Sequence, residues 1–544
     1  MEAADPTSTQ SIIVRSQFPD VEIPEVSLTR FALRRADELA DKAALVDGPS
    51  GRTLTYGQLA SATRKVAASL ARRGLGKGDV FAIFSPNLPE WAIAYFAVSS
   101  LGAINTTINP LATADELAGQ LNDSGAIFLL TIPQFLDKAL DAAGRSKVRE
   151  VFVFGEAEGA TPFASLLDGA GDPPTPSIDP RQDLVVLPYS SGTTGLPKGV
   201  MLTHHNLVGN CVQIDGMEPV TQDDVIIAVL PYFHIYGMTV ILNRGLANGA
   251  TVVSMPRFDL EQFLRILQDY RVTRAYLAPP IVLALAKHPM VEKFDLSALR
   301  MILSGAAPLS ESLQNACAER LGCQVKQGYG LTESSPVTHC NPDDRIKPGS
   351  IGPAVRSTEY RVVDYVSGAD LGPGGHGELL VRGPQVMRGY LNQPAATANT
   401  VDRDGWLHTG DIGYADDDGY FYVVDRLKEL IKYKGFQVPP AELEAVLVSH
   451  PAVADAAVVP FPDEESGEVP KAFIVLKGDA SAEQIMDYVA GRVAPYKKIR
   501  MVELVDQIPK SPSGKILRRV LVERDRDRAT EASGGGSSAA GSAR

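Results

Sequence analysis

A glycine-rich loop with many hydroxyl groups carries the first candidate chemistry in the chain. The segment Pro188-Tyr-Ser-Ser-Gly-Thr-Thr-Gly-Leu-Pro-Lys-Gly-Val200 follows residues 183–187, a short apolar run typical of a buried strand. Glycines permit a turn whose successive backbone N–H groups form a nest for anionic oxygens. The residues that we expect to bind phosphate are Ser190, Ser191, Gly192, Thr193, Thr194, Gly195 and Lys198. Lys198 is followed by glycine, so this is not a Walker loop, and a flexible surface turn is the alternative.

Two further segments combine aromatic and small side chains. In Leu230-Pro-Tyr-Phe-His-Ile-Tyr-Gly-Met238, His234 lies among aromatic residues, where a buried core histidine is the alternative to a functional one. The run from Ser304 through Gly305, Ala306, Ala307 and Pro308 follows an apolar strand. Its small side chains allow a flat ring to approach the backbone, although a plain strand-to-helix turn would have the same composition.

The segment Gln327-Gly-Tyr-Gly-Leu-Thr-Glu333 contains groups suited to a nucleotide. Gly328 and Gly330 permit a tight turn and Tyr329 can stack on a base, while Thr332 can donate to a phosphate. Glu333 offers the oxygen ligands that Mg²⁺ prefers. Further along, the carboxylate of Asp411 suits the two hydroxyls of a ribose, with a turn residue as the alternative.

Basic residues gather in the last part of the chain. They include Arg426, Lys428, Lys432, Lys434, Lys497, Lys498, Arg500, Lys510, Lys515, Arg518 and Arg519. This part is therefore a candidate for contact with phosphates, although charge runs are more often a solvated face.

The composition limits the class of protein. A length of 544 residues predicts more than one domain, since single cores stop growing near about 250–300 residues. The net charge of −13 argues against a general binder of nucleic acid or anionic membranes. Four cysteines without metal-ligand spacing fit a reducing compartment. Neither a signal peptide nor a bilayer-spanning run is visible, so we expect a soluble cytoplasmic protein without a membrane span.

Helical and strand patterns alternate through most of the chain, which argues for parallel sheets flanked by helices. Expected helices are 28–39, 56–73, 91–101, 259–270 and 309–321, and expected strands are 79–83, 126–130, 225–230, 274–277 and 299–303. Residues 341–400 are richer in Gly and Pro and predict a more antiparallel β portion. After a strand at 419–424, a compact α/β pattern follows, with helices from 439 and at 482–493 and strands at 455–459, 471–476 and 500–505. We therefore predict a large domain over 1–425, a small one over 426–527, and a disordered Gly/Ser-rich tail over 528–544.

The order of these segments resembles the adenylate-forming superfamily, which holds acyl-CoA synthetases, beetle luciferases and peptide-synthetase adenylation domains. The similarity runs from about Leu28 to Leu521. It implies an α/β fold in which a large N-terminal domain of mixed sheets precedes a small mobile one. ATP, Mg²⁺ and coenzyme A are the implied cofactor and co-substrates. The reaction implied is attack of a carboxylate on the α-phosphate of ATP, followed by transfer of the acyl group to a thiol.

The resemblance also implies roles for individual residues. The nucleotide would be bound by the loop Ser190–Lys198, by Gly305–Pro308, by Gln327–Gly330 and Thr332, and by Asp411 with Arg426. Glu333 would hold Mg²⁺, Lys515 would reach the α-phosphate and the carboxylate, and Lys428 would be the hinge. His234 would lie between the acyl pocket and the CoA channel. Lys432 and Gln437 would be catalytic, and Lys434, Gly435 and Phe436 would contact CoA.

Within the superfamily, the segments 233–236, 327–333 and 429–437 most resemble 4-coumarate–CoA ligases. The implied acyl pocket consists of Tyr236, Gly305, Gly330, Pro336 and Val337, which suits a flat ring or an aliphatic chain. Ser334-Ser335, Gly237 and Val240 depart from the pattern of the plant enzymes.

Other functions remain open at this stage. They are a medium- or long-chain fatty acyl-CoA synthetase, a ligase that loads a separate carrier protein, a luciferase-type oxidase, and a non-catalytic nucleotide-binding protein. The last would be expected to lack Lys515 or Glu333. The expected partners are a small carboxylic acid, ATP and CoA, with a monomer or homodimer as the assembly.

Overall fold

The computed structural model describes residues 12–168, 171–190, 197–427, 429–434, 436–463, 466–511 and 514–525. The chain divides into two compact units. Unit 1 comprises Met1–Gly375, Leu379–Thr409 and Ala415–Tyr422, and unit 2 comprises His376–Glu378, Gly410–Tyr414 and Val423–Arg544. The predicted tail at 528–544 lies outside the described residues.

The first sheet of unit 1 has eight strands in the order β19-β10-β9-β5-β4-β6-β7-β8. The strands from β9 to β8 are parallel to their neighbours, whereas β10 is antiparallel to both β9 and β19. Its strands are β4 (Val80–Ile83), β5 (Ile104–Thr107), β6 (Phe128–Thr131), β7 (Glu150–Val153), β8 (Thr161–Pro162), β9 (Leu184–Ser190), β10 (Lys198–Thr203) and β19 (Gly389–Tyr390).

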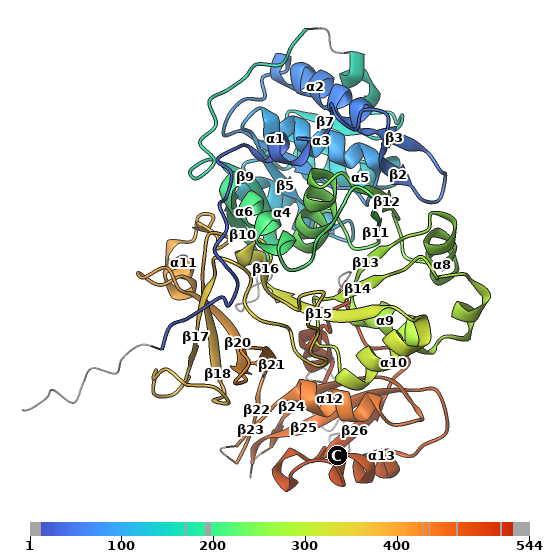
Figure 1. The fold of residues 1–544 in the computed structure, drawn as a ribbon, viewed down its shortest axis with the longest axis vertical. Helices are drawn as coiled ribbons and strands as arrows, with labels where there is room; N and C mark the ends of the chain where they lie inside the picture. The colour runs from blue at the N-terminus through green and yellow to red at the C-terminus, as the bar shows by residue number, and fades with distance from the viewer. Residues whose placement is uncertain are drawn as a thin grey trace, which may run out of the picture. The chain divides into compact units, whose positions relative to one another are not determined.

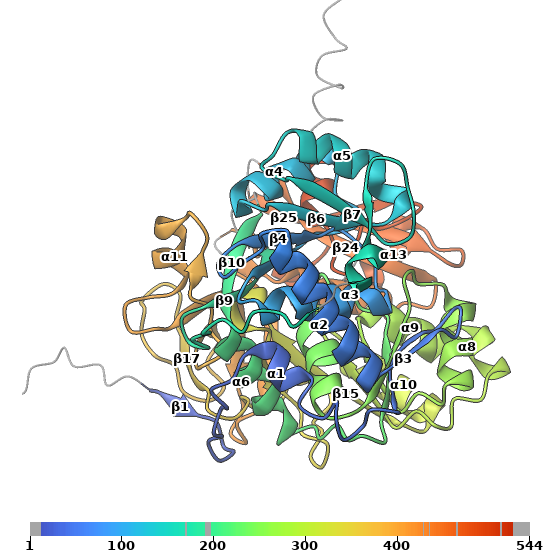
Figure 2. The same ribbon diagram turned by 90° about the horizontal axis from the view of Figure 1, so that it is seen from above.

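Helices cover both faces of this sheet because its strands are apolar on both sides. Phe81 of β4 belongs to the core that includes residues of α2 (Tyr56–Arg72) and α3 (Pro89–Ser100). Its neighbour Ala82 belongs to the core formed with α4 (Ala114–Ser124) and α5 (Leu136–Gly144). Figure 2 shows the two helix pairs on opposite sides of β4, β6 and β7. The predicted strand 79–83 and helices 56–73 and 91–101 are thus confirmed within two residues at each end.

The second sheet of unit 1 also has eight strands, in the order β16-β15-β14-β13-β11-β12-β2-β3. Its interior is parallel, and β16 and β3 are antiparallel at the two edges. The strands are β2 (Ala43–Asp47), β3 (Thr53–Thr55), β11 (Val225–Ala228), β12 (Thr251–Ser254), β13 (Arg274–Leu277), β14 (Met301–Ser304), β15 (Gln324–Gly330) and β16 (Val337–Cys340).

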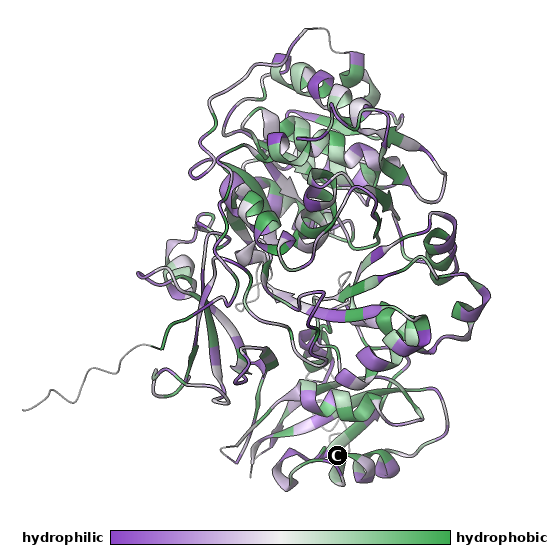
Figure 3. Ribbon diagram, in the orientation of Figure 1, coloured by the Kyte–Doolittle hydropathy of each residue, from purple (hydrophilic) through white to green (hydrophobic). Residues whose placement is uncertain are grey.

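Three helices pack on one face of the second sheet. They are α8 (Leu260–Asp269), α9 (Pro279–Lys287) and α10 (Glu311–Leu321), and Figure 1 shows them beside β13, β14 and β15. Ile227 of β11 belongs to the core beneath these helices, whereas Ile226 points into the core of the first sheet. In Figure 3 the hydrophobic colouring follows the strands and the helix faces turned toward them. The remaining helices of this region are α6 (His204–Asp215), a π-helix over Tyr236–Asn243, and α7 (Arg244–Ala247).

A five-stranded sheet has the order β1-β17-β18-β20-β21, and two of its strands, β17 and β18, lie in the predicted β portion 341–400. It comprises β1 (Val14–Arg15), β17 (Glu359–Val363), β18 (Gly377–Arg382), β20 (Leu407–Ala415) and β21 (Phe421–Arg426). The first two strands are antiparallel. A short helix, α11 (Pro394–Thr400), lies between β19 and β20 in the sequence.

Unit 2 has its own sheet, in which β23, β22, β25 and β24 are neighbours and β26 pairs with β25. Its elements are β22 (Ile431–Tyr433), β23 (Phe436–Val438), α12 (Pro440–Val448), β24 (Val453–Asp463), β25 (Gly467–Leu476), α13 (Ala482–Ala490) and β26 (Met501–Leu504). Leu443 and Leu447 of α12 and Ile485 of α13 are fully buried in one core with the strands. This confirms the compact α/β pattern expected for the end of the chain.

The first predicted helix is wrong in length. The prediction was 28–39, but α1 spans only Leu28–Ala32, and turns follow it. The side chain of Arg34 donates to Asn248, and that of Arg35 donates to the Asn248 carbonyl and to Gln222. These long-range bonds stabilise turns where helical spacing alone favours a helix. None of the helices in the described ranges combines the length and apolarity that crossing a bilayer requires.

Candidate active site

The predicted phosphate loop joins two antiparallel strands of the first sheet. Ser190 is the last residue of β9 and Lys198 the first of β10, and the two residues are paired in register. Five predicted phosphate ligands lie outside the described residues, namely Ser191, Gly192, Thr193, Thr194 and Gly195. The described ends of the loop therefore place one hydroxyl and one ammonium group beside each other on neighbouring strands.

Glu333 lies against the start of this loop. It is on a short 3₁₀ helix, Thr332–Ser334, and is only 6% exposed. Its Oε1 accepts hydrogen bonds from Ser190 Oγ and from the Tyr390 hydroxyl, both at 2.8 Å. Lys198 is also 6% exposed, and its Nζ lies 4.8 Å from the centre of the Tyr390 ring. The structure thus brings together residues that are far apart in sequence.

The surroundings of Glu333 fit a magnesium ion. Within the described ranges, no Lys or Arg forms an ion pair with this buried carboxylate, and the donors Ser190 and Tyr390 both bond to Oε1 rather than to Oε2. A buried carboxylate without a counter-ion is costly, so a bound cation would stabilise it. Oxygen is the donor that Mg²⁺ prefers, and the ion keeps several waters and usually takes only one or two carboxylates. In the described part of the chain no cluster of three or more His, Cys, Asp or Glu forms an all-protein cage.

The predicted adenine segments lie at the carboxyl ends of two adjacent parallel strands. Ser304 of β14 is paired with Gln327 of β15, so Gly305–Pro308 and Gly328–Gly330 emerge side by side. This is the edge at which open α/β sheets bind ligands. Ala306 has a φ of 71°, a left-handed conformation that exposes the backbone of this turn. Tyr329 is half-buried and packs against the ring of His339, with centroids 5.9 Å apart.

The residues of the predicted acyl pocket form two contacting groups, Tyr236 with Gly305 and Gly330 with Pro336 and Val337. The ring of Tyr236 packs directly on Gly305, where an added Cβ would lie 2.9 Å from a ring carbon. The Tyr236 hydroxyl donates to the Leu303 carbonyl at 3.1 Å. Gly330 is in close contact with Pro336, because a Cβ there would lie 2.0 Å from the Pro336 carbonyl oxygen. Val337 begins β16, and its backbone exchanges two hydrogen bonds with the side chain of Asn210.

His234 precedes the π-helix that carries Tyr236, and its Nδ1 accepts from the Tyr236 backbone N–H at 3.3 Å. Gly237 is one of the positions that depart from the pattern of the plant enzymes. A Cβ there would lie 2.2 Å from the Pro231 carbonyl oxygen, so the local packing requires glycine. At the other departures, Val240 is buried and Ser334 is fully buried, with its hydroxyl bonded to the Leu331 and Pro336 carbonyls.

Unit 2 holds the predicted ribose ligands and the predicted catalytic lysine. Arg426 Nε lies 3.2 Å from Asp411 Oδ1, and Asp411 is only 4% exposed. Burial and the nearby charge of Arg426 lower the pKa of Lys515 to about 8, although Glu429 and Asp411 oppose this shift. The backbone of Lys515 is held by Ser511, whose Oγ accepts from the Lys515 N–H at 3.1 Å.

The hairpin of β22 and β23 carries the other predicted groups. Lys432 is exposed on β22, and its register partner is Gln437 of β23. Lys434 is exposed, has a φ of 47°, and donates its N–H to the Ser466 carbonyl. Lys428 and Gly435 lie outside the described residues, and only the backbones of Phe436 and Gln437 are described.

The structure marks two buried polar residues that the sequence analysis did not single out. Tyr390 lies in the segment Arg388-Gly-Tyr-Leu391, and only its contacts with Glu333 and Lys198 mark it. Asp425 is 5% exposed, and burial raises the pKa of its carboxyl to about 7. An acidic residue directly after the apolar run 421–424 was the available signal for it.

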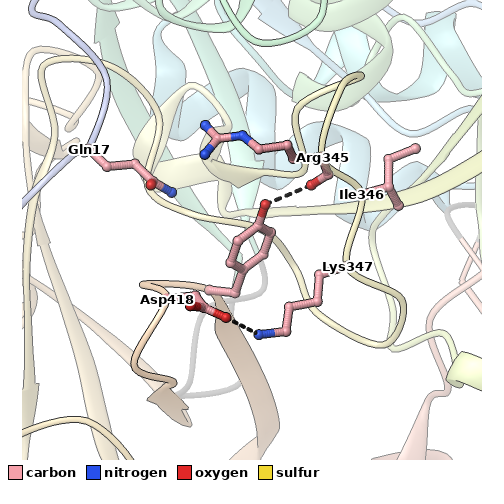
Figure 4. A pocket seen from close by; sticks show the side chains of 6 residues that line it. Gln17, Arg345, Ile346, Lys347 and Asp418 are labelled. Carbon is pink, nitrogen blue, oxygen red and sulfur yellow. Dashed lines mark hydrogen bonds and ion pairs between the residues drawn. The ribbon is translucent and has the colours of Figure 1, made fainter.

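A separate polar hollow lies elsewhere in unit 1. It has a volume of about 490 Å³ and is lined by Gln17, Arg345, Ile346, Lys347, Asp418 and Tyr420. Figure 4 shows the Tyr420 hydroxyl donating to the Arg345 carbonyl, and Lys347 paired with Asp418. Lys347 also pairs with Asp416 at 2.5 Å, so its charge is already neutralised within the fold. None of the predicted site residues is among those lining it.

Comparisons with known proteins agree with this geometry. Residues 33–391 match the model of the AMP-binding enzyme family, and residues 442–515 match the AMP-binding enzyme C-terminal domain. The chain is 45% identical over 526 residues to 4-coumarate--CoA ligase 5 of Oryza sativa subsp. japonica, covering 94% of this chain and 97% of that protein. It is 43% identical over 528 residues to 4-coumarate--CoA ligase 1 of Petroselinum crispum, covering 95% and 97%. Among solved structures, the anthranilate CoA ligase AuaEII in complex with anthranoyl-AMP superposes with a TM-score of 0.86 at 28% identity, covering 94% of this chain and 99% of that chain.

Proposed function

Because the chain belongs to the AMP-binding enzyme family, we propose that it is an ATP-dependent carboxylic acid–CoA ligase whose acids are hydroxycinnamates such as 4-coumarate. The single observation that carries the acid assignment is the 45% identity to a 4-coumarate--CoA ligase along 94% of the chain. The residue types assigned to the acyl pocket also support it. Tyr236 lies against Gly305, which has no side chain, and Gly330, Pro336 and Val337 are small or apolar, which favours a flat ring.

The reaction has two steps. A carboxylate is a poor acylating agent because its leaving group would be oxide. Attack of the carboxylate oxygen on the α-phosphorus of ATP forms an acyl–phosphate bond, breaks the bond to the β-phosphate, and releases pyrophosphate. The sulfur of CoA then attacks the acyl carbon, AMP leaves with the bridging oxygen, and the thiol proton passes to solvent.

The residues of unit 1 bind and orient the nucleotide and the acid in this proposal. Ser190 and the loop that follows it donate hydrogen bonds to phosphate oxygens, together with Lys198 and Thr332. Gly305–Pro308, Gln327 and Gly328 leave room for the adenine, on which Tyr329 stacks. His234 and Tyr236 line the acyl side of the reacting carboxylate. Glu333 would hold Mg²⁺, which when bound neutralises charge on the phosphoryl oxygens.

The residues of unit 2 supply the ribose ligands and further positive charge. Asp411 accepts from the ribose hydroxyls, and Arg426 orients it by the 3.2 Å ion pair. Lys515 brings a cation to the α-phosphate and the carboxylate, where charge develops during the first step. We assign Lys432 and Gln437 to catalysis, Lys428 to a hinge, and Lys434, Gly435 and Phe436 to the CoA arm.

Domain limits and location belong to the same proposal. We propose a nucleotide- and acyl-binding domain over 1–425 and a C-terminal domain over 426–527. A cytoplasmic location is supported by the four cysteines, all of which are buried free thiols. A monomer or a homodimer is proposed for the assembly, and light scattering of the purified chain distinguishes them.

The test is AMP release by the full chain with ATP, Mg²⁺ and CoA, across hydroxycinnamic, benzoic, and medium- and long-chain fatty acids. We expect a kcat/KM for 4-coumarate at least about tenfold above those of the other classes, equal to ~1.4 kcal/mol of transition-state binding. A preference for fatty acids would overturn the assignment of hydroxycinnamates as the acids, and the proposed two-step reaction would still hold. Adenylate formation without a CoA thioester would point instead to a carrier-protein acceptor.

A pair of lysine variants separates an enzyme from a nucleotide-binding protein. Lys515→Ala should abolish ATP–pyrophosphate exchange. Lys510→Ala is the matched control, because that lysine lies nearby in the sequence and pairs with Asp455 at 2.6 Å. Undiminished exchange in Lys515→Ala would remove the role assigned to that residue, and absence of exchange in the unmodified chain would overturn the ligase proposal.

A further inference from the structure

Tyr390 connects the two charged groups of the phosphate side of the site. Its hydroxyl donates to Glu333 Oε1 at 2.8 Å, and its ring face lies 4.8 Å from Lys198 Nζ. All three side chains are at most 6% exposed. One aromatic side chain therefore contacts a buried anion through its edge and a buried cation through its face.

The backbone holds Tyr390 firmly in this place. Tyr390 belongs to β19, which is antiparallel to β10, and its register partner is Val200. Its N–H donates to Thr397 Oγ1 at 2.9 Å, and the next residue, Leu391, donates to the Gly199 carbonyl at 2.8 Å. The tyrosine is thus fixed to the strand that begins at Lys198.

The Glu333 carboxylate is in turn oriented from two sides. Ser190 Oγ and the Tyr390 hydroxyl both donate to Oε1, so the hydrogen bonds fix the rotation of the carboxylate and leave Oε2 available. The Met387 N–H also donates to the Glu333 carbonyl at 2.8 Å, so the segment 387–390 supports this glutamate through both backbone and side chain.

We infer that Tyr390 is a positioning residue that holds the Glu333 carboxylate in the orientation needed to bind magnesium with ATP. This inference rests on the proposed function, in which Glu333 is the metal-binding residue. Groups that orient metal ligands typically contribute about 10–100-fold to metal affinity. A purely structural role in packing would be served by the aromatic ring alone.

The test measures equilibrium binding of ATP to the full chain at increasing Mg²⁺, without acid or CoA. Tyr390→Phe keeps the ring and removes the hydroxyl. We expect this variant to need an about tenfold higher Mg²⁺ concentration for the half-maximal increase in ATP affinity. Binding of ATP in the presence of a chelator should stay within about twofold, since the ring still faces Lys198. A misfolded fraction does not affect the result, because the midpoint of the Mg²⁺ curve is independent of the amount of competent protein.

Tyr189→Phe is the matched control. Its hydroxyl also donates to a carboxylate, Asp123 Oδ2 at 2.6 Å, on the strand that carries Ser190. We expect this variant to keep the wild-type Mg²⁺ midpoint. Glu333→Gln should raise the midpoint further, and Tyr390→Phe should add nothing in that background.

The outcomes separate the two proposals. A wild-type midpoint in Tyr390→Phe, with a raised midpoint in Glu333→Gln, would overturn the positioning role and leave the metal assignment intact. A wild-type midpoint in Glu333→Gln would overturn the metal assignment itself, and with it this inference. An equal shift in Tyr189→Phe would show that the effect is not specific to the Glu333 contact.

Discussion

Arg426 Nε lies 3.2 Å from Oδ1 of Asp411, and the carboxylate is almost fully buried. The two residues are on neighbouring strands, β20 and β21. The ion pair fixes Asp411 Oδ1 and so determines the direction in which the carboxylate presents its remaining lone pairs. A ribose hydroxyl that donates to this carboxylate would therefore meet an acceptor in a fixed orientation.

We predict that Asp411→Asn weakens ATP binding by about 10–100-fold, equal to ~1.5–3 kcal/mol for a hydrogen bond to a charged group. The amide keeps the shape of the side chain but loses the charge and one acceptor. The measurement is the Kd of ATP by titration calorimetry.

The analogue 2′-deoxy-ATP distinguishes a ribose contact from general damage. Wild-type protein should bind it more weakly than ATP, whereas Asp411→Asn should bind both with similar affinity, since the lost acceptor and the lost hydroxyl belong to one bond. Undiminished discrimination in the variant would exclude Asp411 as the ribose ligand.

Asp425 should make the stability of the protein depend on pH. Its folded-state pKa is raised to about 7 by burial, and an unfolded aspartate has a pKa of about 3.9. The folded state therefore binds the proton more tightly than the unfolded state. The contribution of the neutral carboxyl to the free energy of unfolding is fully present below about pH 4 and is lost as pH rises through about 7. Asp425→Asn removes this titration. Between pH 5 and pH 8 we expect the melting temperature of the variant to fall less than that of wild type, with a difference of about 2 °C or more.

Asp455→Asn is the control for this measurement, because its carboxylate is partly exposed and pairs with Lys510. This variant should have a melting temperature close to that of wild type, and its melting temperature should change with pH as that of wild type does. Equal slopes in wild type and Asp425→Asn would show that Asp425 is already ionised in the folded protein at pH 5.

The strands of unit 1 could be predicted from sequence because local composition determines them. The expected strand 274–277 coincides with β13. All four residues of this strand are buried, so both of its faces are covered. The loop, Glu333 and the acyl-pocket residues could be predicted as candidates because they lie in short segments with distinctive residue types. The helix at 28–39 was wrong because Arg34 and Arg35 bond to residues more than 180 positions away.

Tyr390 could not be found in the same way. It lies in a strand of two residues, Gly389–Tyr390, which has no periodicity to detect. Its partners Glu333 and Lys198 are distant in sequence. The pairing of β10 with β19 brings Tyr390 to Lys198, and the hydrogen bond from the Met387 N–H to the Glu333 carbonyl ties the same segment to Glu333. The predicted strand ends at residue 424, before Asp425, and local sequence does not predict that the Ala441 N–H of α12 donates to the Asp425 carboxylate.

Gly305 should determine whether a ring fits the acyl pocket. In Gly305→Ala, the new Cβ would lie 2.9 Å from a ring carbon of Tyr236, and the ring is held by its hydroxyl bond to Leu303. Overpacking of this kind costs ~1–3 kcal/mol, so we expect kcat/KM for 4-coumarate to fall about tenfold or more. A short aliphatic acid should be affected less, because it does not extend along the ring.

Gly119→Ala controls for the loss of a glycine. Gly119 lies in α4, and an added Cβ would have no atom within 4 Å. This variant should retain wild-type kinetics with every acid. If Gly305→Ala reduced the rates with ring-containing and short acids equally, its effect would not be on the fit of the acyl group.

The pH dependence of the first step should follow the ionisation of Lys515. Burial and Arg426 lower its pKa to about 8, so the ammonium that neutralises phosphoryl charge is present below about pH 8 and is lost as pH rises through that value. ATP–pyrophosphate exchange should therefore decline about tenfold per pH unit above pH 8. Lys515→Arg should move this decline to higher pH, because a guanidinium stays protonated. The second step, started from purified acyl-adenylate and CoA at the same pH values, is the control, and an identical decline in both steps would mean that another group is titrating.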